Sequence, residues 1–180
     1  SLRRGKANPK DIELVAIPRI TEAPIRDLFG NEYDSEECNH LEACLYTACL
    51  GDWAYDTTVK RNGPRYKRLR HISGITCDLF IMDLKRFGAI YTIRTGPSEF
   101  SQMLVARAHK FGMFVDGGLL HNHRRTYRET GAGRAAIPLP CEKGEACPLV
   151  IPTSTEASFF AALKVDWIAP ELRRGLKVVA

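Results

Sequence analysis

Apolar residues of the chain alternate with polar ones in some stretches and recur at helical spacing in others. The first pattern, in runs rich in β-branched and aromatic residues, is typical of strands. The second, with an acidic or hydroxyl residue at the start, is typical of helices. The predicted elements are strands over 12–17, 75–82 and 89–94 and helices over 35–50, 98–111 and 155–163.

A break in the pattern at Thr95-Gly96-Pro97 suggests a division of the chain. Composition shifts there, and residues 113–152 then hold short strands and a long excursion rich in Gly and Pro. We therefore predict an α+β protein with one lobe over 1–94 and a second over 95–180.

Length and composition limit the class of protein. The 180 residues, 44% hydrophobic and 26% charged, are enough for one domain or two small lobes with a buried core. This balance excludes a disordered or fibrous chain. No apolar run approaches the ~18 residues of a membrane span, and no signal peptide is visible, so no membrane partner is expected. Ser1 is interpreted as a processed, trimmed or engineered start.

Positive charge exceeds negative charge, with 26 Lys and Arg against 21 Asp and Glu, a net +5. Basic residues cluster around Tyr66 and Tyr127, which makes a nucleic acid a candidate partner. Solvated basic faces are the alternative for each cluster. The candidate nucleic-acid-binding residues are Arg65, Lys67, Arg68, Arg70, Arg124 and Arg125.

Six cysteines without a secretion signal indicate a reducing compartment. A zinc site would draw on Cys38, His40, Cys44 and Cys49, with Cys141 and Cys147 as a possible second pair. No C-x-x-C occurs, and the first group follows the buried stripe of a helix, so small buried thiols are favoured over metal ligands. His121 and His123 are interpreted as surface or loop histidines.

Three carboxylates carry the candidate chemistry. Asp11 and Glu13, two residues apart on a strand, project from one face, and Asp78 lies inside the apolar strand 75–82. If the two strands are adjacent, the three acids meet and require cations; two Mg2+ ions would then support an in-line phosphoryl displacement. The alternatives are solvated acids at a strand edge and an ion pair between Asp78 and a nearby arginine.

The opening Ser1-Leu2-Arg3-Arg4-Gly5-Lys6 adds a hydroxyl, turn amides and guanidinium groups that suit a polyphosphate. With the acids, it resembles the active-site opening of family X, or polymerase beta-like, nucleotidyltransferases. That family has Gly-Ser-x-Arg-Arg, an acid ten residues after the Ser and another two further on, which Ser1, Arg4, Asp11 and Glu13 match. Its third acid and later Thr-Gly turn are matched by Asp78 and by Thr95-Gly96.

This resemblance implies a fold, a cofactor and a set of roles. The fold would be a nucleotidyltransferase palm, a mixed sheet with helices, followed by a small α/β thumb. Two Mg2+ (or Mn2+) ions would be held by Asp11, Glu13 and Asp78, and Asp78 would also draw the proton from the primer hydroxyl. The triphosphate, sugar and base of a nucleoside triphosphate would be bound by Ser1, Arg4, Thr95, Gly96 and Ser101.

The implied function is the addition of deoxynucleotides to a DNA 3′ end, in repair or gap filling, by a monomeric enzyme of the cytoplasm, or of the nucleus in a eukaryote. The alternatives are a nucleotidyltransferase acting on tRNA ends or a small acceptor, and a non-catalytic DNA-binding relic of the fold. The resemblance also implies a cis bond between Gly96 and Pro97. The family's DNA-gripping domains have no counterpart before Ser1, so weak activity, or none, is expected of the chain alone.

Overall fold

The computed structural model describes residues 3, 5, 11–58, 62–130 and 135–173. Helices and strands are mixed, as the sequence predicts. The chain forms two compact units: Lys10–Met82 is one, and Ser1–Pro9 together with Asp83–Ala180 is the other. We call them the sheet unit and the helical unit. The division expected after residue 94 falls instead just before helix α2 (Leu84–Thr95). This helix packs within the helical unit, so the boundary lies earlier than predicted.

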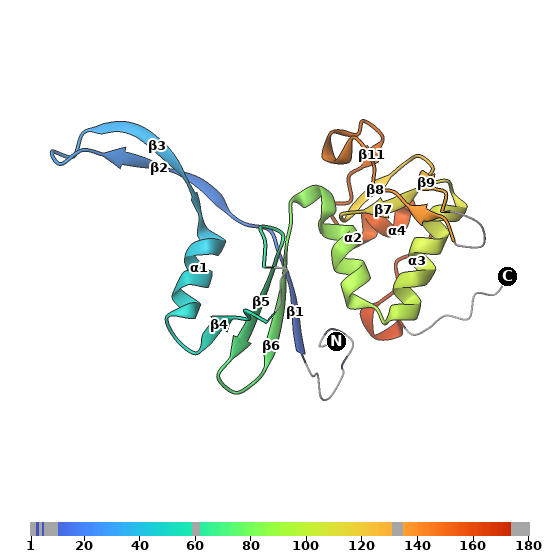
Figure 1. Ribbon diagram of the computed structural model, residues 1–180, viewed down its shortest axis with the longest axis horizontal. Coiled ribbons are helices and arrows are strands. Elements are labelled where there is room, and N and C mark those ends of the chain that lie inside the picture. Colours follow the sequence, from blue (N-terminus) through green and yellow to red (C-terminus); the bar gives the residue numbers. More distant parts are fainter. Residues whose placement is uncertain (1–2, 4, 6–10, 59–61, 131–134, 174–180) are drawn as a thin grey trace. The chain divides into compact units, whose positions relative to one another are not determined.

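The sheet unit is built on four strands in the order β1-β6-β5-β4. Figure 1 shows this sheet with helix α1 (His40–Cys49) beside it. The strands are β1 (Asp11–Ala16), β6 (Thr76–Ile81), β5 (Tyr66–His71) and β4 (Trp53–Tyr55). The predicted strands 12–17 and 75–82 are thus confirmed as β1 and β6. The core, which α1 helps to cover, comprises Leu45, Leu69, Cys77, Leu79 and Ile81.

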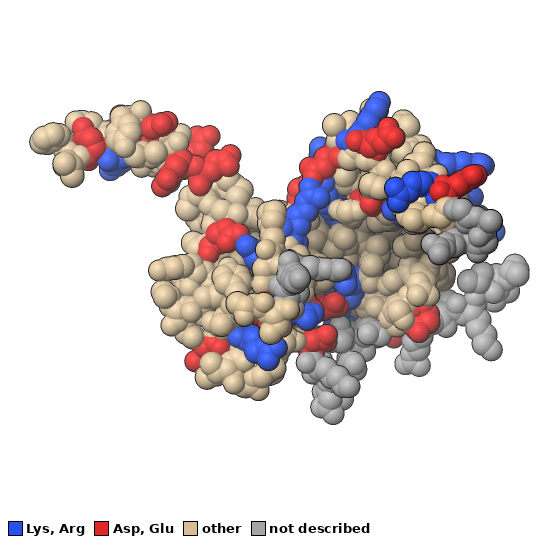
Figure 2. Space-filling model, in the orientation of Figure 1, with Lys and Arg blue, Asp and Glu red and all other residues tan. Residues whose placement is uncertain are grey.

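A two-stranded hairpin of β2 (Ile20–Arg26) and β3 (Glu32–Asn39) also belongs to the sheet unit. The Asp27 carboxylate accepts backbone hydrogen bonds that close its turn, where Gly30 has a φ of 85°. Acidic side chains gather along the hairpin in Figure 2. The helix predicted from residue 35 therefore begins only at His40, where the Asn39 side chain caps it. Residues 35–39, which precede the helix, belong to β3 and pair with β2.

The helical unit contains helices α2, α3 (Ser98–Lys110) and α4 (Glu156–Ala162) around a small sheet. That sheet has the order β11-β8-β7, from Val150–Ile151, Leu119–His121 and Phe114–Asp116. A hairpin of β9 (Tyr127–Arg128) and β10 (Ile137–Pro138) and two 3-10 turns, η2 (Gly144–Ala146) and η3 (Pro170–Leu172), complete the unit. The helices predicted over 98–111 and 155–163 are confirmed.

The strand predicted over 89–94 is wrong, because these residues lie within α2. The β-branched and aromatic residues of this stretch favour a strand locally, but Ala89, Thr92 and Thr95 recur every third residue on the buried face of a helix. Gly88 allows a close approach there: a Cβ on it would lie 2.0 Å from the carbonyl oxygen of Thr155. Packing against the start of α4 therefore decides the conformation.

The core of the helical unit is formed by residues from all three helices and from β8. Its most buried members are Ala89, Phe100, Leu104, Ala108, Leu120, Phe159, Phe160 and Leu163.

None of the helices in the described part of the chain has the length and apolar character of a membrane span.

Candidate active site

The two strands that carry the predicted acids are paired. β1 and β6 run parallel, with Glu13 opposite Asp78 and Asp11 opposite Thr76. Because alternate residues of a strand share a face, this register puts Asp11, Glu13 and Asp78 on one face of the sheet. Cys77 on the other face belongs to the core. The topology therefore sets three carboxylates on one side of two adjacent strands.

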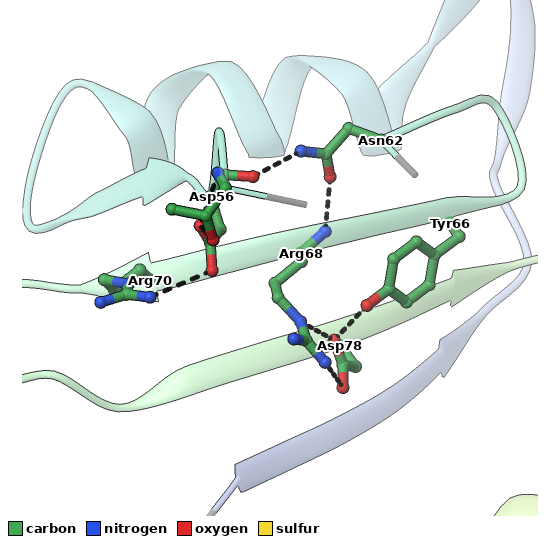
Figure 3. A network of polar contacts seen from close by, with 7 residues as sticks. Asp56, Asn62, Tyr66, Arg68, Arg70 and Asp78 are labelled. Carbon is green, nitrogen blue, oxygen red and sulfur yellow. Dashed lines mark hydrogen bonds and ion pairs between the residues drawn. The ribbon is translucent and has the colours of Figure 1, made fainter. Parts of the chain in front are cut away.

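Asp78 is buried and bonded by side chains of β5, as Figure 3 shows. The Arg68 guanidinium donates to both carboxylate oxygens, Nε to Oδ1 at 2.6 Å and Nη2 to Oδ2 at 2.8 Å. The Tyr66 hydroxyl donates to Oδ1 as well. The hydrogen bond to Asp78 raises the pKa of Arg68, and burial followed by the bond to Asp78 raises the pKa of Tyr66. Of the alternatives for Asp78, pairing with an arginine is what the structure shows.

Asp11 and Glu13 are exposed, whereas Asp78 turns toward Arg68 and Tyr66. The three carboxylates are consequently not gathered as one set of metal ligands among the described residues. Oxygen donors of this kind nevertheless suit a hard cation such as Mg2+, and their placement on one face suits shared coordination. A cation at Asp78 would compete with the guanidinium of Arg68.

The loop before β5 supports this network. Asp56 is buried and accepts hydrogen bonds from the backbone and hydroxyl of Thr58 and from Arg70, which lower its pKa. The Asn62 side chain bridges the loop to β5, donating to the Asp56 carbonyl and accepting from the Arg68 backbone at 2.7 Å (Figure 3). The hydrogen bond to Asn62 holds the backbone of Arg68 in place, and so positions the side chain that reaches Asp78.

Two of the residues predicted to bind nucleotide, Ser1 and Arg4, lie outside the described residues. Thr95 and Gly96 end α2 in the helical unit, where a Cβ on Gly96 would collide with the Phe100 ring at 2.3 Å. The Ser101 hydroxyl donates to the Ile93 carbonyl of α2 at 2.7 Å and to the Pro97 carbonyl at the start of α3 at 3.2 Å. These contacts shape the turn between α2 and α3, and the nucleotide roles stay predictions.

The predicted cis bond between Gly96 and Pro97 is wrong, since the described residues contain no cis peptide. Gly96 and Pro97 are both extended, with ψ of 165° and 167°. The prediction assumed that a strand enters this turn. A helix enters it instead, and two extended trans residues suffice to lead from α2 into α3.

The helical unit contains an ion triad that was not predicted from the sequence. Arg3 donates to both oxygens of Glu156, at 3.1 and 2.9 Å, and Arg173 donates to Oε1 of Glu156 at 2.7 Å. Arg3 also donates to Thr95 Oγ1 at 2.8 Å and lies 4.2 Å from the centre of the Tyr91 ring. Burial alone would raise the pKa of Glu156, but the two arginines lower it. The sequence signal was the Arg-Arg pair, of which only Arg4 was given a role.

Most of the predicted nucleic-acid-binding residues have partners within the protein. Lys67 lies 3.6 Å from Glu42, Arg70 lies 3.2 Å from Asp56, and Arg68 holds Asp78. In the helical unit, Arg125 donates to the Leu139 carbonyl and lies 3.7 Å from Asp116. Arg65 and Arg124 are exposed. Figure 2 shows Lys and Arg side chains around β9, which follows Arg124 and Arg125. Contact with nucleic acid stays a prediction for all six.

The burial of Cys44 and of His121 differs from the prediction. Cys44 is exposed on α1 rather than buried, and Leu45 is the buried member of that helix. His121, expected at the surface, is only 1% exposed, and burial lowers its pKa. A group of four lies in the helical unit, with one ligand atom of each within 4.8 Å of the others: His121, His123, Cys141 and Cys147.

Comparison with known proteins identifies the fold. No family model and no curated protein sequence matches the chain. A solved structure, Leishmania infantum polymerase beta in a ternary P/T complex, superposes on 96% of this chain with a TM-score of 0.60 and 14% identity. The chain has a polymerase beta-like fold. It spans 64% of the length of that polymerase, and at this identity the likeness establishes the fold alone.

Proposed function

We propose that the chain is a metal-dependent nucleotidyltransferase that adds deoxynucleotides to a DNA 3′ end, in repair or gap filling. The observation that carries this proposal is the register of β1 and β6, which sets Asp11, Glu13 and Asp78 on one face of the sheet. This register occurs in a chain of which 96% superposes on a solved polymerase beta structure. In this proposal the sheet unit is the catalytic palm and the helical unit is the thumb.

Asp11, Glu13 and Asp78 would hold the divalent ions, Mg2+ or Mn2+. When bound, such ions neutralise charge on the transferring phosphoryl group. Asp78 would accept the proton of the primer hydroxyl, and a general base must be ionised and oriented to do so. Hydrogen bonds from Tyr66 and Arg68 together set the direction of the Asp78 carboxylate.

The nucleoside triphosphate would be bound by Ser1 and Arg4 through its phosphates and by Thr95, Gly96 and Ser101 through its sugar and base. Guanidinium groups bind phosphate oxygens bidentately, which suits Arg4 to this role. DNA would be held by phosphate contacts from exposed basic residues, which among those predicted are Arg65, Arg70 and Arg124.

One observation favours a second candidate, a non-catalytic DNA-binding relic of the fold. The bidentate bond from Arg68 already satisfies both oxygens of Asp78, the residue that would otherwise bind metal and accept a proton. In such a protein Arg68 would replace the metal as the counter-charge of the acid.

Incorporation of labelled deoxynucleotide on gapped DNA, with Mg2+ or Mn2+, separates these functions. The same reactions are run with a tRNA 3′ end and with a small hydroxyl acceptor, and DNA affinity is measured against salt. Template-directed, metal-dependent extension of gapped DNA supports the polymerase. Transfer confined to tRNA or the small acceptor favours the other transferase. Salt-dependent DNA binding without transfer to any acceptor identifies the relic.

A further inference from the structure

The four residues His121, His123, Cys141 and Cys147 have no part in the proposed phosphoryl transfer. They come from separate stretches of the helical unit: His121 ends β8, His123 follows it, and the two cysteines flank η2 before β11. Both cysteines are free thiols, so no disulfide accounts for their closeness. We propose that these residues form a structural zinc site.

Distances at His123 support this proposal. Its Nε2 lies 3.6 Å from Cys141 Sγ and 3.7 Å from Cys147 Sγ. In a tetrahedral site with Zn–S of about 2.3 Å and Zn–N of about 2.0–2.1 Å, the nitrogen and sulfur ligands are separated by about 3.6 Å. The three atoms therefore already have the spacing of zinc ligands.

The tautomer of the neutral His123 ring is set by its neighbour. Its Nδ1 lies 3.0 Å from the carbonyl oxygen of Arg124, and because a carbonyl only accepts, Nδ1 must carry the proton. In the neutral imidazole, Nε2 then presents its lone pair toward the two sulfur atoms. A ligating histidine held through its other nitrogen by a carbonyl is the usual arrangement around zinc.

His121 supplies an independent observation. The residue is 1% exposed, and its ring is stacked on that of Phe114 with the ring centres 4.9 Å apart. Its Nδ1 has no hydrogen-bond partner among the described residues. A buried polar atom without a partner costs free energy, which a metal ion would relieve. The rings of His121 and His123 are 5.5 Å apart and nearly perpendicular, so both can direct a nitrogen to one point.

Two thiolates and two imidazoles select zinc by their chemistry. Soft sulfur ligands with tetrahedral geometry favour Zn2+ over Mg2+. Binding would release the two thiol protons to water, and the charges of Zn2+ and two thiolates would then cancel, as a half-buried site requires. Four protein ligands leave no open position, which makes the site structural rather than catalytic. A cavity of about 410 Å3 lined by His123, Cys141 and Cys147 provides access for the ion.

A zinc ion bound here would restrain the long segment between β8 and residues 141–147. Its ligands join the end of β8 to the segment 141–147, and the Cys141 backbone is already held by the Asp116 carboxylate at 3.1 Å. Arg86 of α2 pairs with Glu145 of η2 at 2.7 Å. Zinc would thus close the two ends of a loop that has little regular structure of its own.

Metal analysis of the purified full chain tests the proposal. We expect one zinc ion per chain, retained through dialysis, and, on replacement by Co2+, the visible and thiolate charge-transfer bands of a tetrahedral site with two sulfur ligands. Cys141→Ser and Cys147→Ser should each lose stoichiometric zinc and the charge-transfer band. Cys44→Ser, which removes an exposed thiol from the sheet unit, should keep both.

Chelation provides a second readout that does not depend on a variant folding well. Removal of zinc should lower the thermal unfolding temperature of the wild type and of Cys44→Ser, since an ion that binds only the folded state stabilises it. Cys141→Ser should not respond. No bound zinc in the wild type, a Co2+ spectrum without sulfur charge transfer, or equal zinc loss in Cys44→Ser would overturn the proposal and leave a hydrogen-bonded His–Cys cluster.

Discussion

Replacing Glu156 by Gln should destabilise the helical unit more than any exposed Glu→Gln change. The Glu156 carboxylate neutralises Arg173, whose side chain is 0% exposed, and Arg3, whose side chain is 34% exposed. The amide keeps the shape and one acceptor but removes the negative charge. Among the described residues, Arg173 would then be a buried cation without a counter-ion, since its other contacts are to the Ile168 carbonyl and to the rings of Phe100 and Phe160.

Breaking a buried ion pair by removing one partner costs about 3–5 kcal/mol. We expect the low end, about 3 kcal/mol, because Arg3 is partly solvated and Gln still accepts one hydrogen bond. With urea m values of about 1–3 kcal/mol/M, the unfolding midpoint should fall by roughly 1–3 M. Urea titration followed by circular dichroism measures this, with the exposed Glu129→Gln as control, expected within about 0.5 kcal/mol of wild type. A loss below about 1 kcal/mol for Glu156→Gln would refute the reasoning.

The same triad predicts a pH dependence. Hydrogen bonds from Arg3 and Arg173 outweigh burial and hold the pKa of Glu156 below its ordinary value of 4.5. A carboxyl whose pKa is lower in the folded state contributes stability above its unfolded pKa and loses it as pH falls through the folded one. Wild-type stability should therefore decrease below about pH 4.5 by a component that Glu156→Gln lacks. Parallel stability profiles of the two proteins in this range would contradict the assignment.

Three further substitutions test the packing of the helical unit by thermal or urea unfolding. Gly88→Ala should cost about 1–3 kcal/mol because its Cβ would meet the Thr155 carbonyl, whereas Gly63→Ala, with nothing within 4 Å, should be near neutral; equal effects would disprove the close approach. Thr155→Ala removes the hydroxyl of the capping box that starts α4 and should cost about 0.5–2 kcal/mol, and no loss would mean that the cap is dispensable. Leu104→Ala, at a site with 0% exposure, should cost about 2–5 kcal/mol, and a smaller loss would indicate a core that collapses around the cavity.

Elements with a single dominant signal could be predicted from the sequence. The β6 strand could be predicted from the apolar residues on both sides of Asp78. Helix α4 could be predicted from the hydroxyl and the acid at Thr155 and Glu156. Where local preference and packing disagree, the sequence was misleading. Residues 89–94 have strand-like composition, but their burial on one helical face decides for α2.

The candidate site likewise has one part that local sequence patterns predict and one part that depends on the fold. The spacing of Asp11 and Glu13 predicts a shared face directly, because strand periodicity is local. That Arg68, and not another basic residue, would reach Asp78 depends on the register of β5 against β6, which no local pattern contains. The His–Cys group was missed for a similar reason, since 18 residues separate His123 from Cys141 and only the fold brings them together.

The most direct test of the central claim is nucleotide incorporation on gapped DNA by wild type, Asp78→Asn and Asp52→Asn in Mg2+ or Mn2+. Asp52 is the matched control, because its side chain is 66% exposed and its carboxylate lies 3.9 Å from His71, away from the Asp78 network. We predict metal-dependent incorporation by the wild type and by Asp52→Asn, and its loss in Asp78→Asn with near-ultraviolet circular dichroism unchanged. Full activity of Asp78→Asn, or incorporation by the wild type without any divalent metal, would contradict the claim.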